Sequence, residues 1–121
     1  MKKLTGFVLL ALLFASSVYA APTDVNLVPL KRVVSYGQKT VTTAGTEVQL
    51  VASSTVCSSV TIKAIYNNTG YIAVGSNSSV TMANGFLLSP NESISLDVDN
   101  VQDVYIDSSV SAEGVSWIAI I

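Results

Sequence analysis

The stretch Ser93-Ile94-Ser95-Leu96-Asp97-Val98-Asp99 decides the fold class of this chain. Apolar and polar residues alternate strictly along it, which is the period of a β-strand with one buried face and one solvated face. We therefore expect Ile94, Leu96 and Val98 to point into a core, while the serines and aspartates face water.

Similar runs rich in valine, isoleucine and threonine recur along the chain, separated by turn residues such as Asn84-Gly85. No stretch after residue 20 has a sustained helical period. We expect strands near residues 47–52, 58–66, 70–75, 78–82, 86–88, 93–99, 103–107 and 115–121. Short strands at this spacing predict an all-β fold, either a single small β-sandwich or a jelly-roll-like barrel of about eight strands.

Two local sequence patterns predict how neighbouring strands are arranged. The turn sequence Asn67-Asn68-Thr69-Gly70 predicts a hairpin, because asparagine and glycine tolerate the positive φ angles of tight turns. In strand 103–107, Val104 and Ile106 alternate with polar residues. We therefore expect Tyr105 and Asp107 to lie outside.

The first residues of the chain are typical of a cleavable signal peptide. Lys2 and Lys3 precede an apolar run from residue 7 to 15, and Val18 and Ala20 stand at the −3 and −1 positions of a cleavage site. The run is too short to cross a membrane, which takes about 20 residues. We expect export, with the protein secreted, periplasmic or on the surface of an extracellular particle, and no membrane span after cleavage.

The remaining chain divides into an arm and one domain. Residues 21–40 have no clean period and are interrupted by Pro22 and Pro29, so we expect an extended N-terminal arm. The organisation is then a signal peptide at 1–20, the arm at 21–40 and an all-β domain at 41–121.

Composition argues against several classes of function. The chain has eight acidic and six basic residues and no histidine, and no base follows Lys63. An acidic half without cations argues against nucleic acid as a partner. Cys57 is the only cysteine, so we expect a small buried side chain, and a Cys–His pair is impossible. Without a recognisable nucleophile, base or metal motif, we expect no enzyme and no cofactor.

The last expected strand breaks the alternation, because both faces of residues 115–121 are apolar. Such a strand is either central and covered on both faces, or carries an apolar stripe that another subunit buries. We favour a contact between copies of the chain. The predicted contact residues are Val115, Trp117, Ile118 and Ile120.

Two further polar features are candidate ligand sites. Asp97, Asp99 and Asp103 form a weak calcium candidate, although a solvated sheet surface has the same pattern. Exposed tyrosines beside hydrogen-bonding groups suit sugars. The possible ligand-facing residues of this kind are Tyr66, Tyr71 and Tyr105.

An ordered series of β and turn segments covers most of residues 38–121. The segments are Gln38–Val41, Ala44–Leu50, Cys57–Ala64, Asn68–Gly75, Asn84–Leu88, Glu92–Asn100, Val104–Asp107 and Glu113–Trp117. In their order and spacing they resemble a small β-domain of tailed-bacteriophage virion structural proteins, including head-fibre-like and surface-appended proteins. The resemblance implies a non-enzymatic module that decorates or links a particle, commonly as an oligomer.

Those virion proteins do not ordinarily carry a signal peptide. Either the domain has been adopted for an exported role, or the particle is assembled at or beyond the membrane. We therefore expect a structural or surface-decoration module of an extracellular assembly or virus-like particle, present as a homo-oligomer or in a larger particle or filament. The alternative is a secreted carbohydrate-binding or adhesin module.

Overall fold

The computed structural model describes residues 32–121, so the predicted signal peptide and the first part of the predicted arm, residues 21–31, lie outside the described residues. The described chain is all-β, with one short 3₁₀ turn. Its elements are β1 (Val34–Val41), β2 (Val48–Gln49), β3 (Ser59–Ala64), β4 (Ile72–Gly75), β5 (Phe86–Leu88), β6 (Ser93–Leu96), η2 (Val101–Asp103), β7 (Tyr105–Ser108) and β8 (Glu113–Ile120).

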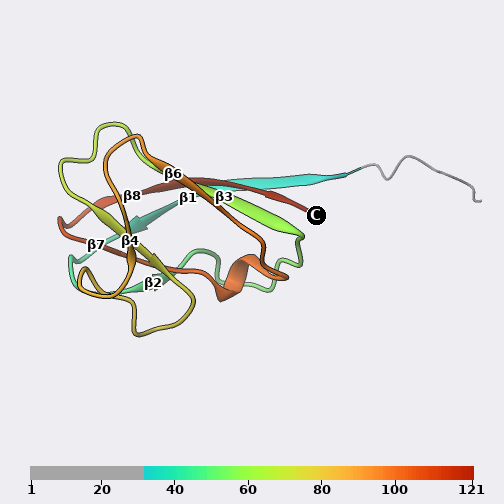
Figure 1. Ribbon diagram of the computed structural model, residues 1–121, viewed down its shortest axis with the longest axis horizontal. Coiled ribbons are helices and arrows are strands. Elements are labelled where there is room, and N and C mark those ends of the chain that lie inside the picture. The colour runs from blue at the N-terminus through green and yellow to red at the C-terminus, as the bar shows by residue number, and fades with distance from the viewer. Residues whose placement is uncertain (1–31) are drawn as a thin grey trace, which may run out of the picture. The chain divides into compact units, whose positions relative to one another are not determined.

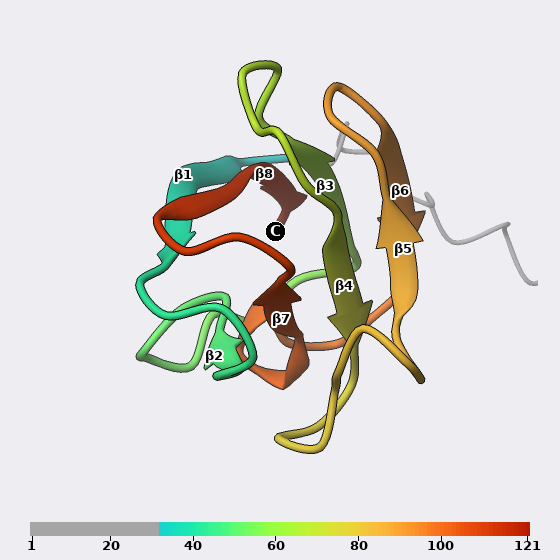
Figure 2. The same ribbon diagram turned by 90° about the vertical axis from the view of Figure 1, so that its left-hand side faces the viewer.

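The strands form two antiparallel sheets of four strands each. One, which we call the β8 sheet, has the order β1-β8-β3-β6, and the other, the β7 sheet, has the order β2-β7-β4-β5. The two sheets lie as layers one above the other (Figure 1). In the view of Figure 2 each layer can be followed from left to right in the order given. The predicted sandwich is therefore present, and the two sheets do not join into a closed barrel.

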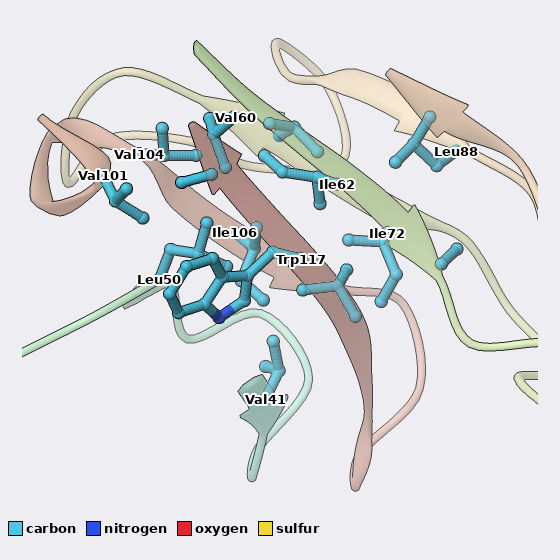
Figure 3. Close-up of a cluster of buried hydrophobic side chains, with 14 of the residues drawn as sticks. Val41, Leu50, Val60, Ile62, Ile72, Leu88, Val101, Val104, Ile106 and Trp117 are labelled. Carbon is cyan, nitrogen blue, oxygen red and sulfur yellow. The ribbon is translucent and has the colours of Figure 1, made fainter. Parts of the chain in front are cut away.

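The core lies between the sheets and takes side chains from both (Figure 3). Val60, Ile62 and Trp117 come from the β8 sheet, and Ile72 and Ile106 come from the β7 sheet. Burying such apolar area stabilises the fold by roughly 25 cal/mol per Å². The alternation expected in residues 93–99 is confirmed, because Ile94, Leu96 and Val98 pack against this core.

The predicted strand at 78–82 is wrong, because this segment is part of the loop between β4 and β5. Its apolar residue Val80 is buried, but it belongs to no strand of either sheet. A Cβ added at Gly75 would lie 2.8 Å from Val80 Cγ2, and one added at Gly85 equally close. The absence of side chains at both glycines therefore leaves room for Val80. In the sequence a buried valine suggests a strand, but Val80 belongs to a loop.

The predicted arm at 21–40 is wrong over its last residues, because Val34–Val41 form β1. Strand β1 pairs antiparallel with β8 over its whole length, from Val34 opposite Ile120 to Val41 opposite Glu113. Its period is hard to read because positions 35, 37 and 39, which share the inner face with Val41, are not apolar. A Cβ at Gly37 would lie 3.1 Å from the ring of Trp117, so the glycine lets the indole pack closely against β1.

The predicted hairpin at Asn67–Gly70 is also wrong. The strands on either side of it belong to different sheets, β3 to the β8 sheet and β4 to the β7 sheet. Strand β3 pairs with β6 and β8, and β4 pairs with β5 and β7. The segment therefore carries the chain from one layer to the other, and a tight-turn sequence does not distinguish such a corner from a hairpin.

Candidate functional site

An exposed apolar patch lies on the outer face of the β8 sheet. Two cross-strand pairs build it, Tyr36 opposite Ile118 and Val34 opposite Ile120. We call these four residues the apolar patch. Tyr36 is 78 % exposed and Ile118 is 46 % exposed, while Val34 is also exposed and Ile120 is half-buried. Apolar side chains gathered on one surface are typical of protein–protein contact sites.

The patch contains half of the contact residues predicted from the last strand. Ile118 and Ile120 lie on the outer face, whereas Val115 and Trp117 are 0 % and 8 % exposed and belong to the core. The prediction of a surface contact is wrong for Val115 and Trp117, because successive side chains of a strand point to opposite faces. The sequence missed Val34 and Tyr36, which the pairing of β1 with β8 places beside the two isoleucines.

The other end of the same outer face is polar. Gln38, Ser116 and Lys63 line a hollow of about 220 Å³, and Tyr66 forms part of its wall. The Gln38 amide donates a hydrogen bond to the Ser116 hydroxyl at 3.3 Å. Tyr66 is exposed, so its ring is available beside these groups.

The three tyrosines predicted to face a ligand do not come together. Tyr66 lies in the β3–β4 connection and lines the hollow of the β8 sheet. Tyr71 directly precedes β4, and Tyr105 begins β7, both in the β7 sheet. Tyr105 pairs with Gly75 at the far end of β4 from Tyr71. Of the three, Tyr66 is the one that lines the hollow formed by Gln38, Ser116 and Lys63.

The calcium candidate does not form a ligand cage. Asp97, Asp99 and Asp103 are all exposed. Over residues 32–121, no three acidic, cysteine or histidine side chains lie close enough together to hold a metal ion. Asp103 instead lines an apolar hollow of about 310 Å³ between the sheets, together with Leu96 and Phe86.

Asp107 is buried, so the expectation that it faces water is wrong. Its Oδ1 accepts hydrogen bonds from the backbone N–H of Gly45 at 3.0 Å and of Ser108 at 2.7 Å. Gly45 has a φ of 80°, a conformation that favours glycine. The carboxylate therefore anchors the β1–β2 loop to β7 and is a structural group.

A second buried carboxylate, Glu113 at the start of β8, was not found from the sequence. It accepts hydrogen bonds from the backbone N–H and the hydroxyl of Thr69, and from the N–H of Gly70 at 3.0 Å. Asn68 beside it is also buried and donates to the carbonyl of Gly114 at 2.8 Å. These bonds fasten the β3–β4 connection to β8.

The charge of Glu113 follows from this environment. Burial alone would raise the pKa of Glu113, but the hydrogen bonds from Thr69 and Gly70 favour the carboxylate and lower the pKa overall. Throughout the described residues, every buried side-chain nitrogen and oxygen has a hydrogen-bond partner. Glu113 is therefore a structural anion whose two carboxylate oxygens both accept hydrogen bonds.

Cys57 is buried, as expected, and belongs to the core. Its thiol donates to the carbonyl of Val98 at 3.1 Å. Burial, together with the nearby carboxylates of Asp99 and Asp103, raises the pKa of Cys57. The reactive form of a cysteine is the thiolate, so this environment makes the side chain inert at neutral pH.

Searches with the whole chain among protein-family models, curated proteins and solved structures found no match. In residues 32–121 there is no helix with the length and apolar character needed to cross a membrane. The surface features described above, the apolar patch and the Tyr66 hollow, are therefore the basis for a functional interpretation.

Proposed function

We propose that this chain is a non-enzymatic structural module of an extracellular assembly or virus-like particle, and that copies associate through the apolar patch. The observation that carries the proposal is the exposure of Tyr36 and Ile118, paired side by side on a sheet face that no described residue covers. A second copy that buries these side chains gains about 25 cal/mol per Å² of apolar surface removed from water.

The arrangement of the strands supports this class of function. The orders β1-β8-β3-β6 and β2-β7-β4-β5 fit a jelly roll, a two-sheet fold of eight strands. Viral capsid and lectin domains use this architecture. Because one fold serves many functions, the strand order adds to the proposal and does not carry it. The resemblance of residues 38–121 to virion structural domains of tailed bacteriophages points in the same direction.

Export belongs to the same proposal. The signal sequence, with Lys2, Lys3 and an apolar run from residue 7 to 15, would deliver the module across a membrane. Outside the cell a disulfide often supports a domain of this size, but this chain has one buried cysteine. Association of copies would supply stability by mass action instead.

Charged substitutions in the patch test the proposal. Ile118→Lys and Tyr36→Lys place an ammonium group where the second copy must exclude water, so both are expected to lower the sedimentation coefficient of the assembly. The matched control is Ser53→Lys in an exposed loop, whose side chain makes no hydrogen bond within residues 32–121. An unchanged assembly in both patch variants would contradict the proposal.

A second function, carbohydrate binding, is favoured by the Tyr66 hollow. An exposed aromatic ring beside the amide of Gln38 and the ammonium of Lys63 offers a stacking surface with hydrogen-bonding groups. A glycan array would detect such binding. If sugars bind here, Tyr66→Ala removes the signal, and Tyr71→Ala, an exposed tyrosine outside this hollow, leaves it unchanged. An array without a sugar hit would exclude this second function.

A further inference from the structure

Within residues 32–121, the backbone of β1 presents a free edge. In an antiparallel pair, residues alternate between exchanging hydrogen bonds with the neighbouring strand and directing their N–H and C=O away from it. The N–H of Ile121 donates to the carbonyl of Val33 at 2.8 Å, so odd-numbered residues of β1 bond to β8. The backbone N–H and C=O groups of the even-numbered residues therefore point away from β8, in the plane of the sheet. These residues are Val34, Tyr36, Gln38 and Thr40.

The opposite side of β8 agrees with this assignment. The N–H of Ile65 donates to the carbonyl of Gly114 at 3.1 Å, so even-numbered residues of β8 bond to β3. The backbone groups of the odd-numbered residues of β8 therefore bond to β1, which agrees with the odd-numbered residues that lie opposite them in β1. Among residues 32–121 no hydrogen bond reaches the outward backbone groups of β1, and no strand pairs with this edge.

This edge differs in length from the other sheet edges. Strand β1 has eight residues, whereas the other edge strands β2, β5 and β6 have two, three and four. Short edge strands protect a protein from pairing with other chains, and a long unpaired edge is a template for such pairing. No proline interrupts β1, so every outward N–H can donate.

We infer that β1 of one copy pairs antiparallel with β1 of a second copy about a two-fold axis at Gly37. The β8 sheets of two copies then form one continuous sheet. This inference rests on the proposed self-association and specifies one contact within it. The second contact, through the apolar patch, uses the face of the same sheet and not its edge.

The register of the pairing between the two β1 strands follows from the outward backbone N–H and C=O groups. With Gly37 opposite Gly37 of the second copy, Val34 lies opposite Thr40 and Tyr36 lies opposite Gln38. All four outward residues of both copies then exchange hydrogen bonds. A shift by two residues in either direction leaves Val34 or Thr40 without a partner. The Gly37 register is therefore the one that satisfies the whole edge.

The side chains are compatible with this register. The pairs on the outer face combine an aromatic residue with an amide and an aliphatic residue with a hydroxyl, so no like charges meet. On the inner face, Lys39 lies opposite Ser35 of the second copy. The two-fold axis also makes the contact self-complementary, as a closed dimer requires.

Disulfide trapping tests the register. Tyr36→Cys and Gln38→Cys variants are mixed and oxidised. Residues opposite each other in a hydrogen-bonded pair have Cα atoms about 5.5 Å apart, which suits a disulfide. We expect most of the mixed protein to form a disulfide-linked heterodimer. Each variant alone is expected to remain unlinked, because its cysteines would be two residues apart along the strands.

The controls separate the possible outcomes. Thr42→Cys, an exposed residue just beyond β1, reports random collision and should remain unlinked. Linkage of Tyr36→Cys with itself would contradict the Gly37 register. An assembly of normal mass without any linkage would overturn the edge pairing and leave the proposed function standing. Monomers in every sample would overturn both.

Discussion

Buried carboxylates are the residues whose roles are most sharply defined by the structure. Glu113 holds the β3–β4 connection through Thr69 and Gly70, and Asp107 holds the β1–β2 loop through Gly45. No pattern in the sequence distinguishes these two residues from the other acidic residues. Hydrogen bonds to charged groups are each worth about 1.5–3 kcal/mol. These two side chains therefore fasten connections that the short strands alone would hold weakly.

The stability that Glu113 contributes to the fold is expected to depend on pH. Because the pKa of Glu113 is lowered in the folded protein, its carboxylate stabilises the fold at pH values above its ordinary pKa. This contribution is lost as the pH falls through the folded pKa. Glu113→Gln is expected to lower the free energy of unfolding by about 1–3 kcal/mol at pH 7 and to reduce the loss of stability on acidification.

Urea unfolding at a series of pH values measures this effect. The control is Glu47→Gln, because no hydrogen bond to the Glu47 side chain is present within residues 32–121. Its free energy of unfolding should follow that of the wild type at each pH. Equal acid sensitivity of Glu113→Gln and the wild type would contradict the structural role assigned to Glu113.

At the scale of elements, β1 combines two roles, since one edge bonds to β8 and the other has no partner strand within residues 32–121. Proline has no N–H, so its cost in a strand depends on the side to which the missing group pointed. Lys39→Pro removes an N–H that points to β8, and is expected to cost about 1–3 kcal/mol of stability. Gln38→Pro removes an outward N–H and should cost less.

The two proline variants are compared by urea unfolding at a concentration where both are monomeric. A second measurement, the sedimentation of Gln38→Pro at high concentration, should show loss of edge pairing although the domain remains folded. Equal destabilisation by both prolines would contradict the assignment of the inward and outward edges.

The elements also show what the sequence could predict. The strict alternation of residues 93–99 was sufficient to predict a strand with Ile94, Leu96 and Val98 on its inner face, because one face is buried and the other is solvated. Strand β1 was missed because Gly37 and Lys39 face inward, and a false strand was predicted around Val80 because a buried loop residue resembles a buried strand residue. Which of two apolar faces of 115–121 points inward depends on the neighbouring sheet, so Val115 and Trp117 could not be separated from Ile118.

At the scale of the whole molecule, the two sheets enclose one core and leave two different surfaces on the β8 sheet. The apolar patch and the free edge of β1 are adjacent, because Val34 and Tyr36 belong to both. In the proposed assembly, edge pairing would close a dimer, and contact through the patch would join dimers into a larger assembly. A structural module needs this combination of contacts, whereas a binding module needs an accessible hollow such as that of Tyr66.

The most direct test of the central claim, that copies of this chain associate, is native mass spectrometry of the exported wild-type protein. One spectrum reports the mass of each chain and the number of chains in the assembly. We predict chains that begin at Ala21 and an assembly of two or more of them that grows with concentration. A single chain at every concentration would contradict self-association, and a mass that includes residues 1–20 would contradict cleavage of the signal peptide.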